Sequence, residues 1–418
     1  MAAELPRLRS FDCSLALLAD PYRFIGERCR ELDSDVFEAR LMLQPTIFLH
    51  GAEAAELFYD AERFQRSGAA PEPLRATLFG KGTVQSLDGA MHRQRKALFV
   101  AATTPASIDA LVAETRRAWQ RVVPKSPGIG PVSLYALARE ALTRAACAWA
   151  GVPLAENEVA LRTRQLSLLF DGAAGGPVQH LRSRLARRRA EEWLARLIES
   201  ARSAGAALAA GGIAQQVADH RDADGQPMAP RIAAAELLNL LRPTVAISVF
   251  IVFAAHALHA HPSWRARLRT SRDRVELDAF VQEVRRFYPF FPAVVARTRR
   301  EFEWRGHRFP AGRRTLLDLF GTNHDARCWE APAKFRPERF LDDAPGPFSF
   351  VPQGGSTVKG NHRCPGEGIT RALTAQAVEL LLDRLDTTVA AQDFRVDHAR
   401  LPALPREQFM LRRVRWVD

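Results

Sequence analysis

One cysteine, Cys364, lies in a stretch of sequence that could hold a metal-bound thiolate. Residues 349–368 contain five glycines and two prolines, and an amphipathic helical pattern follows them. Glycines permit unusual backbone angles and leave room for a flat ligand against the loop. Pro365 suits the first position of a helix, so we expect Cys364 at a helix N-terminus, where N–H groups and the helix dipole stabilise a thiolate. An inert buried cysteine in a glycine-rich turn is the alternative.

Charged residues before this loop could hold it in place. Glu283 and Arg286 are spaced to share one side of a helix, and Arg336 and Arg339 follow within the segment 334–340. A buried carboxylate persists in a fold when arginines pair with it. Each motif alone is common on solvated helices, but their order and spacing favour a rigid ligand site.

Positive charge next to the cysteine indicates what kind of ligand the loop could hold. His362 and Arg363 directly precede Cys364. Such charge suits a flat ligand that carries carboxylates, such as haem with its propionates. The loop therefore suits a haem whose iron binds the sulfur of Cys364, and the inert buried cysteine stays the alternative at this point.

Arg242 and Pro243 interrupt the longest apolar helical stretch, which runs from 233 to 262. Proline cannot donate an N–H to the carbonyl of Asn239, so we expect a kink with an intrinsic cost of ~3 kcal/mol. An arginine does not act as a general acid or base, but it can clamp a substrate carboxylate. A structural salt bridge to Glu236 or to a more distant carboxylate is the alternative. The uncharged run after Arg242 is under about 20 residues, so we expect no membrane span.

These motifs together resemble those of the cytochrome P-450 superfamily. The resemblance spans essentially the whole chain and rests on Glu283-x-x-Arg286, on Pro-Glu-Arg-Phe at 337–340 and on the cysteine loop at 352–368. It implies the P-450 fold, with a long kinked central helix over haem b (iron protoporphyrin IX). It also implies that Cys364 is the proximal ligand of the iron.

Within that superfamily the chain is similar to the bacterial fatty-acid peroxygenases. The loop opens with Pro-Gln-Gly-Gly at 352–355, and Arg242 and Pro243 match the motif of this subgroup. Three residues depart from the usual pattern, which has an aromatic residue at the first of these positions and glycine at the other two: Thr357, Ser356 and Asn361.

The subgroup resemblance implies an enzyme that hydroxylates long-chain fatty acids at the α or β carbon. Members of the superfamily that activate oxygen carry an acid and a hydroxyl residue in the central helix, whereas this chain has Arg242 and Pro243. Hydrogen peroxide already brings both oxygens and both electrons, so no obligatory reductase is expected. The substrate carboxylate, held by Arg242, then serves as the acid and base of the reaction.

The resemblance also assigns residues around the haem and the substrate. Arg66, His92 and Lys96 are the expected propionate partners, and His92 and Lys96 share a helix face; a solvated basic helix is the alternative. Gln85 is expected over the haem, where glutamine accompanies hydroxylation and histidine accompanies decarboxylation to terminal alkenes. The expected lining of the acyl channel, for which ordinary core packing is the alternative, is Leu78, Phe79 and Phe290, with Phe291 bulkier than the glycine of related enzymes.

Three other functions fit parts of this pattern. A redox-partner-dependent P-450 monooxygenase would dock an acidic ferredoxin on the basic surface. A fatty-acid decarboxylase that makes terminal alkenes would use the same site. A non-enzymatic haem sensor could also use a Cys-Pro pair, but Glu283, Arg286 and Arg339 argue for a deep and rigid site.

Composition narrows the class of protein. The chain has 418 residues, of which 47% are hydrophobic, and this is enough for a large core. The first 24 residues contain no apolar run long enough for a signal peptide, so a cytoplasmic protein is expected. Five scattered cysteines argue against a disulfide framework. The net charge is +12, but arginines alternate with acids, as in 182–197, and we expect no nucleic-acid binding.

The elements that must position these residues follow from hydrophobic periodicity. Alternating residues at 35–51 predict a short β-hairpin around Gln44-Pro45. Alanine-rich helices are predicted over about 100–285, with breaks at 125–131, 171–178 and 221–228. Short strands are expected around Arg305-Gly306 and 310–312. The pattern predicts one catalytic domain over 1–418, mainly α with small β-sheets (α+β).

Overall fold

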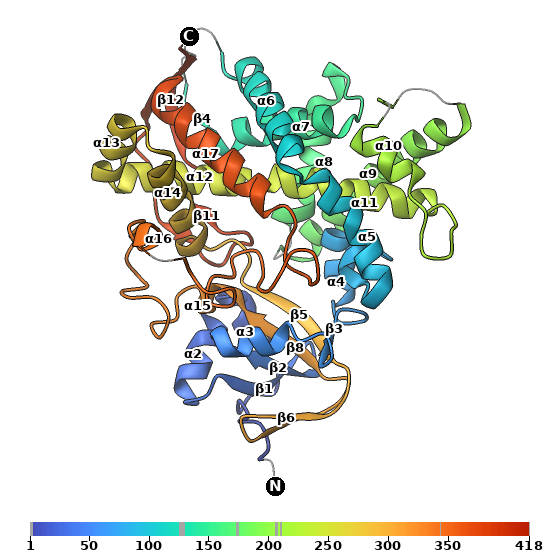
Figure 1. Ribbon diagram of the computed structural model, residues 1–418. Coiled ribbons are helices and arrows are strands. Elements are labelled where there is room, and N and C mark those ends of the chain that lie inside the picture. Colours follow the sequence, from blue (N-terminus) through green and yellow to red (C-terminus); the bar gives the residue numbers. More distant parts are fainter. Residues whose placement is uncertain are drawn as a thin grey trace.

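The computed structural model describes residues 3–124, 130–172, 175–204, 208–209, 211–342 and 344–417. Helices dominate this part of the chain, and the strands form small sheets (Figure 1). The prediction of a mainly α protein with small β-sheets is therefore confirmed. Two of the predicted breaks between helices, at 125–131 and 171–178, lie partly outside the described residues.

The N-terminal third contains helices and two helical turns, which carry the expected substrate-site residues Leu78, Phe79 and Gln85. Thr104 begins α6, because its side chain accepts from the N–H of Ser107 and Pro105 takes the first helical position. The helices of this part are α1 (Ser14–Ala19), α2 (Phe24–Glu31), α3 (Ala52–Phe58), α4 (Glu72–Leu74), α5 (Gly89–Ala102) and α6 (Pro105–Val122), with the π-helical turn η1 (Arg75–Phe79) and the 3-10 turn η2 (Val84–Ser86).

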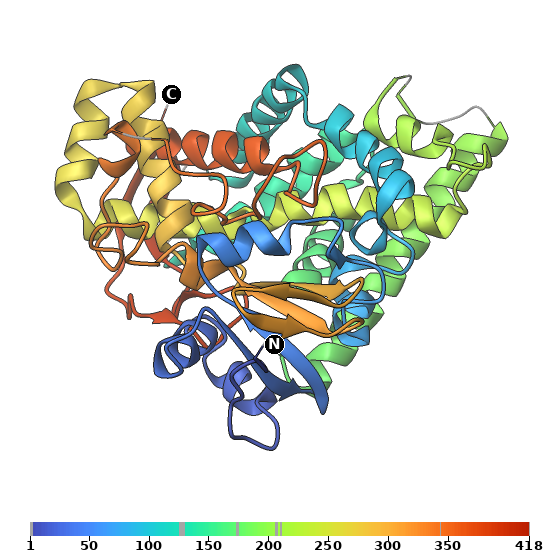
Figure 2. The same ribbon diagram turned by 60° about the horizontal axis from the view of Figure 1, so that its bottom comes forward.

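The largest hydrophobic core surrounds two consecutive helices, α11 (Pro230–Ala246) and α12 (Ser248–Ala260). They cross the middle of the molecule in both views (Figures 1 and 2). Helices α7 and α9 pack against α11, and α17 packs against α12. The other helices of the middle of the chain are α7 (Leu134–Ala150), the 3-10 turn η3 (Glu156–Glu158), α8 (Val159–Asp171), α9 (Pro177–Ala204) and α10 (Ile213–Asp219).

Pro243 does not end the central helix. Helix α11 continues through Pro243 to Ala246, and the break comes at Ile247. The hydroxyl of Thr244 donates to the carbonyl of Leu240 at 2.9 Å, which satisfies a carbonyl near the proline. The expected kink of the central helix therefore corresponds to the break at Ile247, about one turn after Pro243.

This central stretch is apolar enough to be compared with a membrane span. Of the described helices, Pro230–Ala260 alone is long and apolar enough, and 94% of its most apolar window is buried inside the protein. The bent pair α5 and α6 passes the same composition test only when its two helices are taken together. Burial on all sides is what a core helix of a folded domain requires.

The C-terminal half supplies the helices that carry the cysteine loop. Asp273 caps α14, because its carboxylate accepts from the N–H of Val275 at 2.8 Å. The helices of this part are α13 (Pro262–Ser271), α14 (Arg274–Phe287), α15 (Leu319–Thr322), α16 (Arg339–Asp342) and α17 (Glu367–Asp383).

A five-stranded sheet in the order β1-β2-β8-β5-β3 lies apart from the central helices, near the N-terminus (Figure 2). Strands β2 and β8 are parallel and the other neighbours antiparallel. Its strands are β1 (Val36–Leu41), β2 (Gln44–Leu49), β8 (Arg314–Asp318), β5 (Ala293–Thr298) and β3 (Phe64–Gln65). The smaller sheets pair β6 (Phe302–Trp304) with β7 (His307–Phe309), β12 (Met410–Trp416) with β4 (Val132–Ser133) and β9 (Leu385–Val389), and β10 (Val396–Asp397) with β11 (Leu404–Pro405).

The two expected hairpins form, with one difference. The β6–β7 turn lies at Arg305-Gly306 as predicted, whereas the β1–β2 turn lies at Met42-Leu43 and Gln44 and Pro45 belong to β2. The strand after 310–312 begins only at Arg314. Met42 and Leu43 both have positive φ, 52° and 60°, as a two-residue turn that matches strand twist requires. Neither is glycine or asparagine, so the sequence contained no turn signal at this point.

We expect the double substitution Met42→Asn with Leu43→Gly to stabilise the protein. Asparagine and glycine tolerate the left-handed conformation, so the free energy of unfolding should rise by roughly 1 kcal/mol per residue. Urea denaturation measures this change. Met91→Asn, at an exposed methionine of α5, is the control and should not stabilise. Equal or lower stability of the double variant would contradict the assignment of strain to this turn.

Candidate active site

The loop before α17 places Cys364 against the backbone of its own turn. The N–H of Cys364 donates to the carbonyl of Gln353 at 3.0 Å. Gly354 has a φ of 98°, and a Cβ there would lie 2.7 Å from the hydroxyl of Tyr59. A larger residue would therefore push the loop away from α3.

Helix α17 begins later than the sequence predicted. Its first residue is Glu367 and its N-cap is Gly366, so Pro365 precedes the helix and is not its first residue. Burial raises the pKa of the Cys364 thiol, and this effect exceeds the opposite effects of the Gly366 N–H, Lys96 and Arg242. The helix end alone therefore does not favour an anionic sulfur, whereas a bound metal cation would favour the thiolate.

A buried ion pair that the sequence reasoning missed ties α14 to the cysteine loop. Arg285 is 1% exposed and donates to Glu367 at 2.6 Å and to Gln353 at 2.9 Å. Arg363 also donates to Glu367, at 2.7 Å. Burial opposes ionisation, but the two arginines outweigh it and lower the pKa of Glu367 to about 2. The only sequence signal was that Arg285 sits beside Arg286 on an amphipathic helix.

The cluster around Glu283 is present, with Glu283 and Arg286 fully buried and Arg339 mostly buried. Arg286 donates to both carboxylate oxygens of Glu283, at 2.7 and 2.8 Å, and Arg339 approaches it at 3.3 Å. Arg286 also donates to the carbonyl of Asn323 at 2.9 Å. The predicted pairing of the Arg336 guanidinium with Glu283 is wrong. The backbone N–H of Arg336 donates to Glu283, whereas its guanidinium pairs with the exposed Glu330.

The two departures from glycine in the loop have structural consequences. Asn361 donates to the carbonyl of Tyr59 at 2.7 Å and to the hydroxyl of Ser356 at 3.3 Å, so its side chain ties the loop to the end of α3. Ser356 has a φ of 66°, a conformation that glycine adopts at no steric cost. Asn361 therefore adds hydrogen bonds, and Ser356 adds backbone strain.

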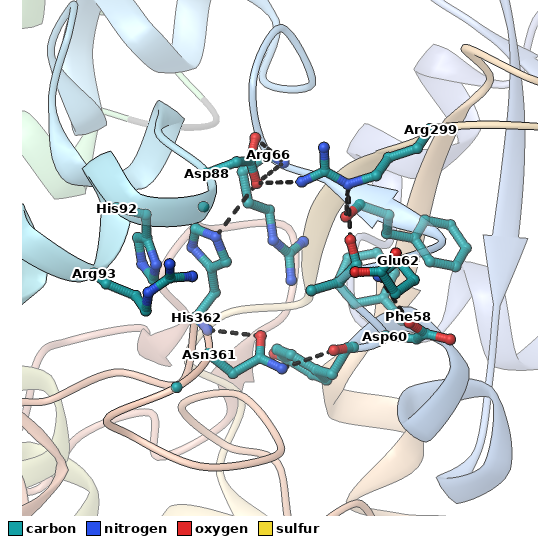
Figure 3. Close-up of a pocket in the computed structure, with 15 residues that line it drawn as sticks. Phe58, Asp60, Glu62, Arg66, Asp88, His92, Arg93, Arg299, Asn361 and His362 are labelled. Carbon is teal, nitrogen blue, oxygen red and sulfur yellow. Dashed lines mark hydrogen bonds and ion pairs between the residues drawn. The ribbon is translucent and has the colours of Figure 1, made fainter.

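Three of the predicted haem-binding residues, Arg66, His92 and His362, line one cavity of about 310 Å³, whereas Lys96 is not part of its lining (Figure 3). The rings of His92 and His362 stack with centroids 3.9 Å apart, and His362 lies 3.7 Å from Asp88. The guanidinium of Arg66 lies 4.2 Å from the ring of Phe58 and donates to a strand carbonyl at 2.7 Å. Burial lowers the pKa of His92 to about 3 and that of His362 to about 4. Both imidazoles are therefore neutral near pH 7.

The surroundings of Lys96 indicate whether these residues fit a haem. Its side chain is buried, and its ammonium donates to the backbone carbonyls of Asn361 and Arg363. Among the described residues no carboxylate pairs with Lys96, and burial lowers its pKa to about 8. A buried ammonium without a counter-anion, beside Arg66 and near Cys364, fits a ligand that brings carboxylates. The residues present therefore suit a haem, with Cys364 as the donor to its iron.

Arg242 is buried in α11 without an ion-pair partner. It is 6% exposed, and its one hydrogen bond within the described chain goes to Asn239, at 3.4 Å. The alternative of a salt bridge to Glu236 does not hold, because Glu236 pairs with Arg95 at 2.9 Å. Burial, and then the charge of Arg187, lower the pKa of Arg242 to about 9, whereas Cys364 acts in the opposite direction.

The expected substrate-lining residues lie around this part of the core. Leu78 is buried, Phe79 packs against the core, and the backbone carbonyls of both accept from Arg187 of α9. The ring of Phe290 lies 4.6 Å from that of Phe250 on α12 and 4.7 Å from that of Phe291. Gln85 lies on η2 and accepts from Asn239 at 3.2 Å. Asn239 and Arg187 were missed in the sequence, although Asn239 stands one turn before Arg242 in an apolar helix.

The fold and this site define a class of protein that holds a planar, carboxylate-bearing metal cofactor on a cysteine beneath a central helix. The family model of cytochrome P450 matches residues 267–410. A segment of 76 residues is 37% identical to cytochrome P450 4e5, mitochondrial, of Drosophila mettleri, and this match covers 18% of the chain and 15% of that relative.

Solved structures match over nearly the whole chain. A variant of cytochrome P450SP alpha (CYP152B1) is 47% identical with a TM-score of 0.95, covering 97% of this chain and 100% of that one. Cytochrome P450EX alpha (CYP152N1) with myristic acid is 41% identical with a TM-score of 0.95, covering 99% and 100%. A variant of cytochrome P450 OleT in complex with arachidonic acid is 31% identical with a TM-score of 0.94, covering 100% and 99%. The chain belongs to the cytochrome P450 family, and a haem cofactor follows from that membership.

We expect Glu283→Gln to destabilise the protein strongly. The substitution leaves the buried Arg286 and Arg339 without their carboxylate, a change that typically costs about 3–5 kcal/mol. Urea denaturation of the variant against the wild type measures this loss. Glu330→Gln removes an ion pair that is largely exposed, and it should change stability little. Equal effects of the two substitutions would contradict the structural role of the Glu283 cluster.

Proposed function

We propose that the protein is a haem-thiolate peroxygenase, which uses hydrogen peroxide to hydroxylate long-chain fatty acids at the α or β carbon. Two observations of other proteins support the substrate class: P450EX alpha was solved with myristic acid and a variant of OleT with arachidonic acid. The cofactor proposed is haem b, bound through Cys364. The proposed catalytic unit is the single domain 1–418, and its location in the cytoplasm stays a prediction from the sequence.

The observation that carries this proposal is the unpaired charge of Arg242. A guanidinium that is 6% exposed and lacks a carboxylate partner among the described residues is costly unless an anion binds it. The resemblance to cytochromes P450 places α11 over the haem, so the anion would lie on the cofactor side of this helix. A fatty-acid carboxylate bound there would bring its α and β carbons closest to the iron, and position selects the carbon that reacts.

The division of roles follows from the chemistry of each group. Haem, when bound, supplies the redox chemistry of the overall reaction, in which R–H and H₂O₂ give R–OH and H₂O. Arg242 stays protonated and cannot carry the proton, so the substrate carboxylate that it holds acts as acid and base. Pro243 takes the place next to Arg242 where a hydroxyl residue of an oxygen-activating enzyme would stand.

The remaining site residues complete the proposal. Gln85 faces the substrate carboxylate from η2 and can donate from its amide without titrating. Leu78, Phe79 and Phe290 form apolar walls for the acyl chain. The cations and imidazoles proposed to receive the haem propionates are Arg66, His92, Lys96 and His362. No obligatory reductase is part of this proposal.

We expect Arg242→Leu to lose peroxide-driven fatty-acid turnover by at least about 100-fold, because the substrate loses the charged group that orients it. The absorption spectrum of the thiolate-bound haem should stay intact. Product formation with hydrogen peroxide and a series of saturated acids measures the effect. Arg189→Leu, at an exposed arginine of α9, is the matched control and should leave turnover unchanged.

Two results would contradict the proposed function. Retained turnover in Arg242→Leu would show that the carboxylate is held elsewhere. Turnover that requires a reductase and NADPH, with none from peroxide, would favour a redox-partner-dependent monooxygenase. A missing thiolate signature in the carbon-monoxide difference spectrum would exclude both enzymes.

Product analysis tests the reaction type. The wild-type protein should give mainly hydroxy acids, since the amide of Gln85 cannot donate a proton as an imidazolium can. Gln85→His should raise the share of terminal alkenes. Mass spectrometry of products from one saturated acid measures both, and alkenes predominating with the wild type would instead support a decarboxylase.

A further inference from the structure

Helix α11 carries a row of polar side chains inside the apolar core. Glu236, Asn239 and Arg242 follow one another at intervals of three residues, and all three are buried. Asn239 lies within hydrogen-bonding distance of both neighbours, 3.3 Å from Glu236 and 3.4 Å from Arg242. Buried polar groups must find partners within the protein, so this row is a connected unit.

The surroundings of Asn239 determine which way its amide points. The carbonyl of Phe79 lies 3.1 Å from its nitrogen, and a carboxylate oxygen of Glu236 lies 3.3 Å away. A carbonyl and a carboxylate can only accept, so they require the N–H₂ end of the amide on their side. The amide oxygen of Asn239 must then face the guanidinium of Arg242.

The orientation of the Asn239 amide also determines the orientation of the Gln85 amide. The side-chain oxygen of Gln85 lies 3.2 Å from the Asn239 nitrogen, so the two N–H groups of Asn239 are shared among three acceptors, on Phe79, Glu236 and Gln85. This contact uses the oxygen of the Gln85 amide and leaves its N–H₂ end for another acceptor. One asparagine thus orients a glutamine as a donor and holds an arginine.

Glu236 is itself fixed from outside the helix. It accepts from the N–H of Val84 at 2.8 Å and from Arg95 at 2.9 Å. Arg95 continues to Asp222 through a contact of 3.1 Å. Arg95 belongs to α5, the helix that also carries His92 and Lys96. The row on α11 is therefore anchored to the wall that lines the proposed haem edge.

We propose that Asn239 is a positioning residue, which sets both the guanidinium of Arg242 and the donor end of Gln85 toward a fatty-acid carboxylate. This inference rests on the proposed function, since it concerns the same substrate. Without the amide oxygen, Arg242 has no hydrogen-bond partner among the described residues and can take other rotamers. The carboxylate would then bind more weakly, and the acyl carbons would lie differently over the reacting centre.

The test compares Asn239→Ala and Asn239→Asp with the wild type. Fatty-acid affinity is measured by calorimetry, and the ratio of α- to β-hydroxy acids by mass spectrometry. Asn239→Ala should weaken binding roughly 10-fold, as loss of a hydrogen bond to a charged group does, and should change the product ratio. Asn239→Asp should weaken binding further, because its carboxylate competes with the substrate for Arg242.

Two controls separate positioning from general destabilisation. Thr143→Val removes a buried hydroxyl that bonds only within α7, and it should leave affinity and product ratio unchanged. In an Arg242→Leu background, adding Asn239→Ala should weaken binding less than it does in the wild type, because only the contribution through Gln85 remains. A purely structural role would lower the melting temperature without changing the product ratio of the folded enzyme.

The outcomes distinguish this inference from the proposed function. If the wild-type protein does not hydroxylate fatty acids with peroxide, the proposed function fails. If the wild type does so and Asn239→Ala keeps the wild-type affinity and product ratio, only the role of Asn239 fails. Should Asn239→Ala not fold, Asn239→Ser, which also lacks the amide oxygen that contacts Arg242 but keeps a donor for Glu236, gives the same decision through affinity and product ratio.

Discussion

The burial of a charged Arg242 in the central helix is the constraint on which the rest of the site depends. Desolvating a guanidinium is unfavourable, and the lowered pKa of Arg242 expresses that cost. The protein offsets it with a single amide oxygen from Asn239, and its Nε has no partner among the described groups. An arrangement that is incomplete in this way favours any ligand that brings an anion, so in the proposed function the same imbalance that weakens the fold would drive substrate binding.

A second excess of positive charge lies on the other side of the site. Lys96 is buried against backbone carbonyls. Arg66 packs on aromatic rings and lines the same cavity as His92 and His362. The two groups of cations require different anions, since one set surrounds the cysteine loop and the other lies on α11. In the proposed function, cofactor carboxylates would satisfy the first group and a substrate carboxylate the second.

The residue types in the sequence indicated which residues to propose for the site, but not which residues contact one another. Cys364, Glu283 and Arg242 could be found because each is chemically out of place in its surroundings. Arg285 could not, because it adjoins Arg286 on one helix and only tertiary packing shows that both are buried. Boundaries were wrong where tertiary context overrides local rules, as at the Met42-Leu43 turn and at the start of α17. The mainly helical fold followed from periodicity, which depends on burial and not on single residues.

The loop around Cys364 shows why departures from a family pattern need a structure before they can be judged. A serine at the positive φ of position 356 costs of order 1 kcal/mol relative to glycine. The side chain of Asn361 offsets part of this free-energy cost by donating to the carbonyl of Tyr59 and to the hydroxyl of Ser356. The two departures are therefore coupled, because one supplies the hydroxyl that the other contacts. Their joint effect keeps the backbone of the loop, which leads into Cys364, against the end of α3.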